Sequence, residues 1–275
     1  MKLIIVLLVL GLRRLDIDWP SWLRENPLRS GFQSADGSAE GAEWLLKVFL
    51  PALLVGVVMV WLHHILWGLP TLVLGLLLLL WVLGVDSEFR QFDELLVRAR
   101  MNDTEQFAEL ANVHFGVAIE PGSPGYYRTL THAISQREVT RLFVMLFYVI
   151  TLGYGFVLFY ALNFWLAERE QDANSWARRW HEAMLWLPVR LLVLALAIGG
   201  DFRRVMEAVD GKIWQASGGS ELFAQALDAA RDVDELDDAA APGEAVEMLE
   251  DLQSLQLRVL AIWMIFAALW TVLAI

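Results

Sequence analysis

The chain alternates between long apolar runs and polar segments. Three runs carry almost no charged side chain, namely residues 48–85, 142–166 and 257–275. Apolar runs of about 18 residues or more are typical of membrane-spanning helices. We therefore predict an all-α, polytopic integral membrane protein with amphipathic helices outside its spans.

The first of these runs is divided by Gly68-Leu69-Pro70, because glycine next to proline favours a tight turn. We therefore expect a transmembrane hairpin over 45–85. Its two helices, and the two further spans, are predicted at about 45–66, 70–85, 142–166 and 257–275.

The chain begins with a short apolar stretch, residues 1–12. Twelve residues of helix extend about 18 Å, which is too short to cross a bilayer alone. No small-x-small cleavage site follows, so a removable signal peptide is not indicated. We expect region 1–44 to combine an uncleaved, partly inserted helix with a polar segment.

Two polar regions separate the apolar runs. Region 86–141 is predicted to be helical, with Asp103 and Gln106 forming a capping box and a helix beginning at Tyr126 after a loop. Region 201–256 is predicted to be acidic and helical, with Ser220 capping one helix.

Lysine and arginine in short loops indicate which side of the membrane a segment occupies. Six basic residues lie in 2–47 and six in 86–141, against four spread over 201–251. We therefore expect regions 1–44 and 86–141 to be cytoplasmic. The side of 201–256 depends on whether the segment 182–200 crosses the bilayer, which charge counting leaves open.

That segment lies within the sequence HEAMLWLPVRLLVLALAIGG, residues 181–200, and contains Pro188 and Arg190. Proline removes a backbone donor, so it should kink the helix and free a carbonyl near Met184. A charge at the centre of an apolar helix costs about 2.5–3.5 kcal/mol on insertion scales. Either Arg190 contacts an anion or phosphate, or it is a structural charge that pairs with Glu182, Glu138 or a helix end, or snorkels to the interface.

A second polar cluster lies in YYRTLTHAISQREVTRLF, residues 126–143. Arg128 and His132 fall on one helical face, and Glu138 and Arg141 are spaced to pair. These side chains either line a pocket at the membrane surface or serve as positive-inside anchors with ordinary helical pairing.

Composition narrows the chemistry. The chain has no cysteine, which excludes disulfides and thiolate sites, and its net charge of −12 argues against nucleic-acid binding. The histidines lack the spacing of metal ligands, so no metal site is expected. No phosphate-binding loop, GxSxG or HExxH occurs, so no catalytic residue is assigned.

The segment W-x₂-R-W-H-E-A-M-L-W-L-P-V-R-L, residues 176–191, resembles the AmpE family of inner-membrane proteins. LPTLVLG at 69–75, R-x-N-D at 100–103 and the position of the final span are also AmpE-like. The same segment is similar to N-W-L-P-A-R-L in the adenosylcobinamide-phosphate synthase of cobalamin assembly, which forms an amide bond with ATP.

The AmpE resemblance implies a multi-pass protein of the bacterial inner membrane, linked to β-lactamase induction and peptidoglycan recycling. In such genomes it is encoded beside a cytosolic anhydromuropeptide amidase. The partners that the resemblance implies are the lipid bilayer, a cell-wall-derived ligand, and that amidase or another regulatory protein.

The chain departs from the synthase where the synthase is acidic. SQREVTRLF keeps Glu138 from an E-N-x-S-D motif, and LNFWLAERE keeps Asn163 and Arg169 from a longer polar run. Because the acids that would hold Mg²⁺ and ATP are largely missing while Arg190 remains, we favour a non-catalytic regulator.

This regulator would bind a ligand or partner through an arginine-bearing helical interior. The expected ligand-site residues are Arg190, Glu138, Arg141, Arg128, His132 and Asn163, with no cofactor assigned. An ATP-dependent amide-forming synthase that uses Mg-ATP and a small muropeptide transporter stay open as alternatives.

Overall fold

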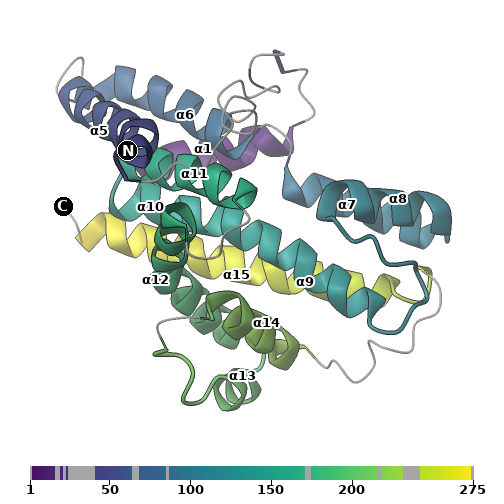
Figure 1. The fold of residues 1–275 in the computed structure, drawn as a ribbon. Helices are drawn as coiled ribbons and strands as arrows, with labels where there is room; N and C mark the ends of the chain where they lie inside the picture. Colours follow the sequence, from purple (N-terminus) through teal and green to yellow (C-terminus); the bar gives the residue numbers. More distant parts are fainter. Residues whose placement is uncertain are drawn as a thin grey trace. The chain divides into compact units, whose positions relative to one another are not determined.

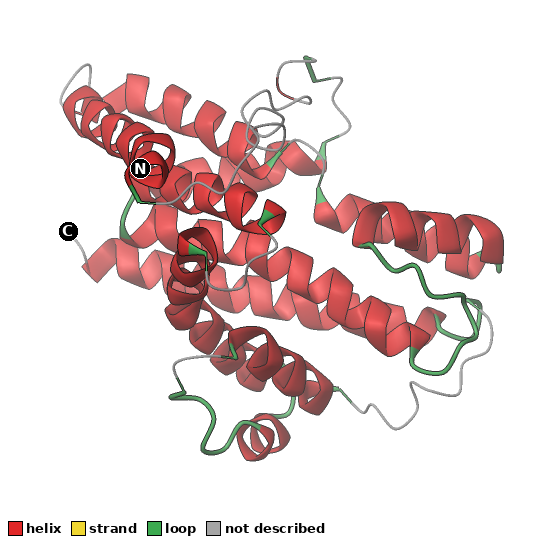
Figure 2. Ribbon diagram, viewed as in Figure 1, coloured by secondary structure: helices red, strands yellow, loops and turns green. Residues whose placement is uncertain are grey.

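The computed structural model describes residues 2–15, 19–20, 23, 41–63, 68–84, 87–170, 175–215, 218–231 and 242–273. Every regular element in these ranges is a helix (Figure 1 and Figure 2). The predicted all-α class is therefore confirmed.

Contacts divide the chain into two compact units. Unit 1 comprises Met1–Ser87, Arg141–Leu185 and Ala267–Ile275, and unit 2 comprises Glu88–Thr140 and Trp186–Phe266. Since this division follows contacts rather than hydropathy, the segment boundaries and membrane sides expected from the sequence stay predictions.

Unit 1 contains most of the apolar helices. They are α1 (Lys2–Arg14), α4 (Ala42–Trp44), η1 (Leu45–Phe49), α5 (Leu50–His63), α6 (Leu69–Leu83), α10 (Val144–Thr151), α11 (Tyr154–Arg169), the first part of α12 (Trp176–Gly199) and the end of α15 (Val246–Leu273). The helix α1 packs on α6 and α10, and α5 packs on α6 and α11. The expected N-terminal helix and apolar hairpin are thus both present as helices.

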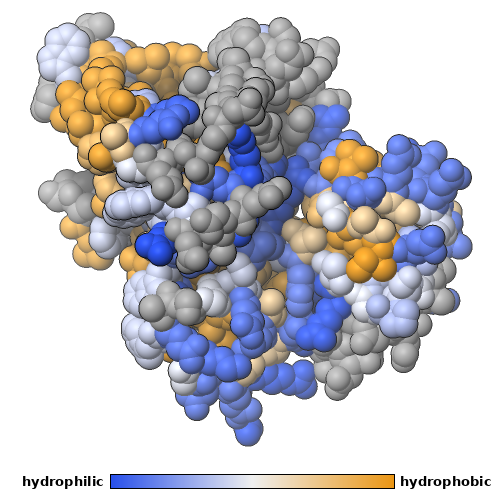
Figure 3. All heavy atoms as spheres, in the orientation of Figure 1, coloured by the Kyte–Doolittle hydropathy of each residue, from blue (hydrophilic) through white to orange (hydrophobic). Residues whose placement is uncertain are grey.

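The apolar surface of α5 is largely uncovered by protein. Leu53, Leu54, Val57 and Trp61 are each at least half exposed, and the face of α5 and α6 seen in Figure 3 is mostly apolar. On its other side α5 lies so close to α11 that a Cβ atom added to Gly155 would be only 2.9 Å from the Cα of Gly56. The exposed leucine, valine and tryptophan side chains of α5 are suited to contact with lipid.

The run 142–166, which we expected to form one span, is broken in the structure. The helix α10 ends at Thr151 and α11 begins at Tyr154, and the two helices pack on each other. Gly153 between them has a backbone φ of 95°, which residues other than glycine rarely adopt. Our expectation of a continuous helix was wrong because hydropathy records apolar character and not a glycine that turns the chain.

The helix α12 is continuous from Trp176 to Gly199 and contains Pro188. A proline at this position leaves the carbonyl of Met184 without its helical donor. Tyr148 donates a hydrogen bond from its Oη to this carbonyl at 2.7 Å. The freed carbonyl that the sequence predicts therefore has a side-chain partner within unit 1.

Unit 2 contains the more polar helices. They are α7 (Glu88–Arg100), α8 (Thr104–Phe115), α9 (Tyr126–Glu138), the second part of α12, α13 (Phe202–Ala208), α14 (Gly219–Ala230) and α15 (Val246–Leu273) as far as Phe266. The π-helix η3 (Val139–Phe143) continues from α9 into α10.

Two predicted helix caps have different outcomes. Asp103 accepts a hydrogen bond from the backbone N–H of Gln106 at 3.2 Å, as expected. Ser220, in contrast, lies inside the first turn of α14, whose N-cap is Gly218 with φ of 82°. The prediction for Ser220 was wrong because the left-handed glycine starts the helix before the serine.

Three described helices are long and apolar enough to cross a membrane, namely Ala42–His63, Trp176–Gly199 and Val246–Leu273. The helices α6 and α7 pass the same test only as a bent pair. The protein is therefore a membrane protein, while the number of crossings stays a prediction.

Candidate functional site

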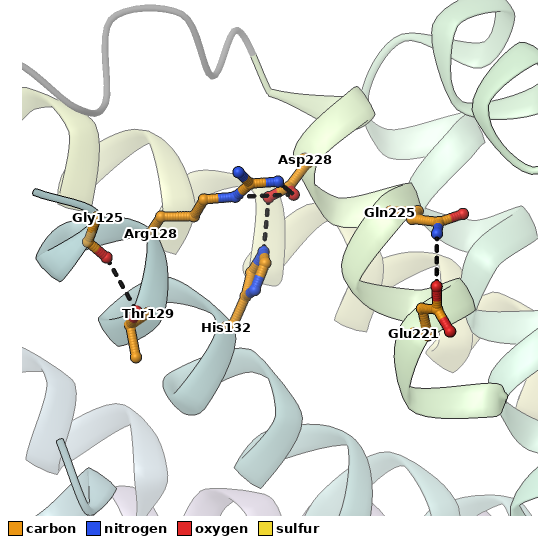
Figure 4. Close-up of polar contacts among 7 residues, drawn as sticks. All are labelled: Gly125, Arg128, Thr129, His132, Glu221, Gln225 and Asp228. Atoms are coloured by element: carbon orange, nitrogen blue, oxygen red, sulfur yellow. Dashed lines mark hydrogen bonds and ion pairs between the residues drawn. The ribbon is translucent and has the colours of Figure 1, made fainter.

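Three polar side chains meet between α9 and α14. Arg128 donates from Nε and Nη2 to Oδ2 of Asp228 at 3.2 and 2.7 Å. His132 Nε2 lies 2.6 Å from Oδ1 of the same carboxylate (Figure 4). Arg128 and His132 lie one helical turn apart on α9, as their spacing in the sequence predicts, and together they hold the carboxylate at three points.

The local sequence explains this arrangement. The loop before α9 ends at Gly125, whose φ of 76° starts the helix so that Arg128 falls in its first turn. On α14, Asp228 follows the buried Leu227 and so lies at the edge of the buried face. Gln136 donates a second, longer hydrogen bond to Ser220 Oγ at 3.4 Å, which extends the contact along both helices.

The electrostatics keep Asp228 ionised. Burial alone raises the pKa of this carboxyl, but hydrogen bonds from His132 and Arg128 and their positive charges outweigh it and lower the pKa overall. The sequence analysis did not select Asp228. Its sequence signal was an acid at the border of the apolar face of an amphipathic helix, which is a common and unspecific pattern.

Glu138 lies at the end of α9, six residues after His132, and it is buried. Burial, followed by repulsion from the Glu88 carboxylate, raises the pKa of Glu138 well above its usual range. Glu138 is therefore close to a second buried acid on α7. The predicted pairing of Glu138 with Arg141 stays a prediction.

Arg190 on α12 is bound to backbone carbonyls. Its Nε donates to the Ile213 carbonyl at 2.6 Å and its Nη1 to the Trp186 carbonyl at 2.7 Å, and its Nη2 donates to the Gln215 carbonyl. The guanidinium also lies over the Trp186 ring, 4.2 Å from its centroid, and Trp186 Nε1 donates to the Gln215 carbonyl at 3.2 Å.

These contacts give Arg190 a structural role, because it fastens the irregular segment that contains Ile213 and Gln215 to α12. A ligand anion would have to displace these carbonyls. The structure thus favours the structural alternative over the anion contact, with backbone carbonyls as partners that neither alternative named.

Asn163 on α11 links three parts of unit 1. It is fully buried; its Oδ1 accepts from Trp44 Nε1 at 3.0 Å, and its Nδ2 donates to the Ala177 carbonyl at 2.9 Å. The Trp44 ring also stacks on that of Trp180, with centroids 5.7 Å apart. These contacts hold α4, α11 and α12 together.

The six expected ligand-site residues are therefore distributed over several sites. Arg128, His132 and Glu138 share α9, Arg190 lies elsewhere in unit 2, and Arg141 and Asn163 belong to unit 1. Among the described residues, no group of three or more His, Asp, Glu or Cys side chains is placed to hold a metal ion.

Comparisons with known proteins identify the family. The family model described as "Regulatory signalling modulator protein AmpE" matches residues 1–270. Neither the curated proteins nor the solved structures gave a match. A match over nearly the whole chain supports a regulatory role, and the chain belongs to the AmpE family of regulatory signalling modulators.

Proposed function

We propose that the protein is a non-catalytic regulator in the bacterial inner membrane, acting in β-lactamase induction and peptidoglycan recycling. In this proposal, unit 2 binds a cell-wall-derived ligand. Membership of the AmpE family supports the regulatory part. The observation that carries the ligand part is the three-point contact of Arg128 and His132 with a carboxylate (Figure 4).

The Asp228 carboxylate stands where a ligand anion would bind. The arginine guanidinium is a planar group whose donors match a carboxylate or phosphate, and a neighbouring imidazole adds a further donor. The Arg128 side chain is 50% exposed, so an incoming anion reaches it from solvent. Peptide-bearing fragments of the cell wall carry several carboxylates and are therefore suitable competitors.

A ligand anion that displaced the Asp228 carboxylate from Arg128 and His132 would release α14 from α9. The helix α14 packs against α13, so both would be affected together. The helix α9 continues through η3 into the apolar α10. A change at this contact therefore has a covalent path toward the apolar helices, and the proposed signal needs no chemical reaction.

The test is ligand-dependent thermal stability of the detergent-purified protein. The panel contains anhydromuropeptides, a nucleotide-linked muropeptide, Mg-ATP and cobinamide phosphate. A ligand present at 100 times its Kd adds about 2.7 kcal/mol to the free energy of unfolding. We expect a muropeptide to stabilise the wild type and not the Arg128→Ala variant.

Asp228→Asn supplies the sharper comparison. Because it removes the competing carboxylate charge and keeps the side-chain shape, we expect tighter muropeptide binding than in the wild type. Arg203→Ala is the matched control, since Arg203 also pairs with an acid but lies on α13. Unchanged binding in both Arg128→Ala and Asp228→Asn would contradict the proposal, and stabilisation by Mg-ATP with its consumption would favour the synthase.

A further inference from the structure

The second part of α12, in unit 2, leaves one narrow apolar face uncovered. Leu187, Leu194 and Ile198 are 46%, 37% and 64% exposed, and every residue between them is buried or half-buried. Spacings of seven and four residues place the three side chains on one face of a helix. These three residues are called the α12 stripe below.

An irregular loop crosses α12 beside this stripe. Arg190 lies three residues after Leu187, so it is next to the stripe on the same side of the helix. Its guanidinium binds the carbonyls of Ile213 and Gln215. Trp214, between these two residues, is thus held beside the stripe, and it is 78% exposed.

The loop is polar where it passes α12. Lys212 and Gln215 are exposed, and Lys212 donates from Nζ to Oε1 of Gln225 on α14 at 2.9 Å. Exposed polar side chains are costly in the centre of a bilayer, because lipid tails offer no hydrogen bonds. The part of α12 that carries Arg190 therefore lies at the level of water or of lipid headgroups.

The end of α12 is followed by charged residues. The helix ends at Gly199, and Arg203 and Glu207 on the next helix form an exposed ion pair. Between Arg190 and Gly199 the helix rises about 13.5 Å, whereas the hydrocarbon core of a bilayer is about 30 Å thick. A segment this short with polar surroundings at both ends cannot cross the core, so it lies along the surface.

We propose that the α12 stripe and Trp214 form a surface of unit 2 that rests on the lipid bilayer, with this part of α12 parallel to the membrane. Tryptophan is suited to the headgroup region. Leucine and isoleucine on one face of a helix are suited to the boundary between headgroups and acyl chains. Because the chain is a membrane protein, a bilayer is the apolar phase always available to unit 2.

This arrangement has a consequence for topology. The helix α12 is apolar enough to cross a membrane, but here it stays on one side, which is one of the two alternatives that charge counting leaves open. The inference does not depend on the proposed ligand contact at Asp228.

The experiment uses the full-length protein in liposomes of phosphatidylethanolamine and phosphatidylglycerol. Since the chain has no cysteine, single cysteines can be labelled with a nitroxide. The four variants are Leu187→Cys, Leu194→Cys, Ile198→Cys and Trp214→Cys. Because these side chains are largely uncovered, their replacement should leave the fold intact.

Electron paramagnetic resonance measures the access of each label to oxygen, which concentrates in lipid, and to a water-soluble nickel chelate. We expect all four labels to favour oxygen, at similar depths of about 5–10 Å below the headgroups. Leu54→Cys on the uncovered face of α5 is the lipid reference. Glu105→Cys on α8, at an exposed acid, is the water reference.

Three results would overturn the proposal. A depth that changes by about 16 Å between Leu187→Cys and Ile198→Cys would mean that α12 crosses the bilayer, since eleven residues rise by that distance. Access to the nickel chelate as high as in Glu105→Cys would mean that the stripe faces water. Labels that neither reagent reaches would mean that protein, such as a second copy of the chain, covers it.

Discussion

The helices α5 and α12 both belong to segments apolar enough to cross a membrane, but they use this character differently. Only 17% of the apolar window in Ala42–His63 is buried inside the protein, against 61% in Trp176–Gly199. The first segment presents leucine and valine outward, while the second is mostly covered by other parts of the chain. Two segments that are both apolar enough to cross a membrane therefore differ in their surroundings, since one leaves most of its apolar side chains uncovered and the other is largely enclosed by protein.

Because α12 is enclosed by protein, it can contain Pro188 and Arg190, whose polar groups find partners in the chain. The carbonyl left unpaired by Pro188 is bound by Tyr148, and Arg190 binds three backbone carbonyls. A helix surrounded by lipid has no such partners, since lipid tails offer no hydrogen bonds. An apolar run that retains a proline and an arginine is thus typical of a helix whose neighbours are protein.

The largest expected effect comes from truncating matched leucines on the two helices. Leu192 on α12 is 2% exposed and Leu54 on α5 is 57% exposed. Leu192→Ala should lower the free energy of unfolding by roughly 3–5 kcal/mol, because it leaves a cavity in a packed core. Leu54→Ala should change it by about 0.5 kcal/mol or less, as at an uncovered surface.

Equilibrium unfolding in mixed micelles measures both changes. Because the two substitutions remove the same atoms, any difference reports the surroundings and not the side chain. Equal losses at Leu54 and Leu192 would mean that α5 is covered as α12 is, and the comparison would fail.

The next effect concerns Arg190. Arg190→Leu removes the side-chain donor from the carbonyls of Trp186 and Ile213, at about 1–2 kcal/mol for each of these part-buried groups, while the Gln215 carbonyl keeps its hydrogen bond from Trp186 Nε1. Removal of a costly charge offsets part of this loss, so we expect a net destabilisation of roughly 2–3 kcal/mol, measured by the same unfolding assay.

Arg190→Lys should recover only part of the stability, because an ammonium cannot reproduce the planar geometry of the guanidinium. A stability equal to the wild type in Arg190→Leu would show that the carbonyls find other donors. Arg190 would then be free for the ligand contact considered from the sequence.

The sequence was sufficient for the fold class and for some local signals, although it misplaced the cap of α14 at Ser220. Long apolar runs predicted the class, Asp103 predicted a cap, and Pro188 predicted an unpaired carbonyl at Met184. Each of these depends on neighbours a few residues apart, which sequence shows directly. The break at Gly153 was missed because glycine is common in membrane helices, and its positive φ becomes visible only in three dimensions.

The partners of the polar side chains were beyond the reach of the sequence. Asp228 lies 100 positions from Arg128, and two of the three carbonyls that bind Arg190, those of Ile213 and Gln215, belong to a segment with no pattern of its own. Backbone carbonyls are present at every residue, so composition cannot select among them. The grouping of Arg128 with His132 was predictable, whereas the acid that completes it was not.

A smaller effect tests the role of Tyr148. Tyr148→Phe removes the donor to the Met184 carbonyl and should cost about 1–2 kcal/mol. Pro188→Ala restores a backbone N–H for the same carbonyl. The cost of Tyr148→Phe should therefore fall in the Pro188→Ala background, which a double-mutant cycle measures as a coupling energy. Additive effects would show that the tyrosine acts only through packing.

The smallest expected effect is a difference between α5 and α14 in their response to acid. The helix α5 has no Asp or Glu, whereas α14 is held to α9 by Asp228, whose pKa is lowered in the folded state. Stabilisation by such a group is present above the unfolded pKa of about 4 and is lost as pH falls through the folded value. Because Arg128 is half exposed, the loss should be roughly 1 kcal/mol or less.

Hydrogen exchange, corrected for the intrinsic effect of pH on amide rates, measures this loss locally. Below about pH 4, where an ordinary aspartate is protonated, we expect protection to fall in α14 and stay constant in α5. Asp228→Asn should remove the dependence on pH in α14, because its amide does not titrate. If protection in α14 still fell with pH in Asp228→Asn, another group would hold it, and the contrast between the two regions would rest on burial alone.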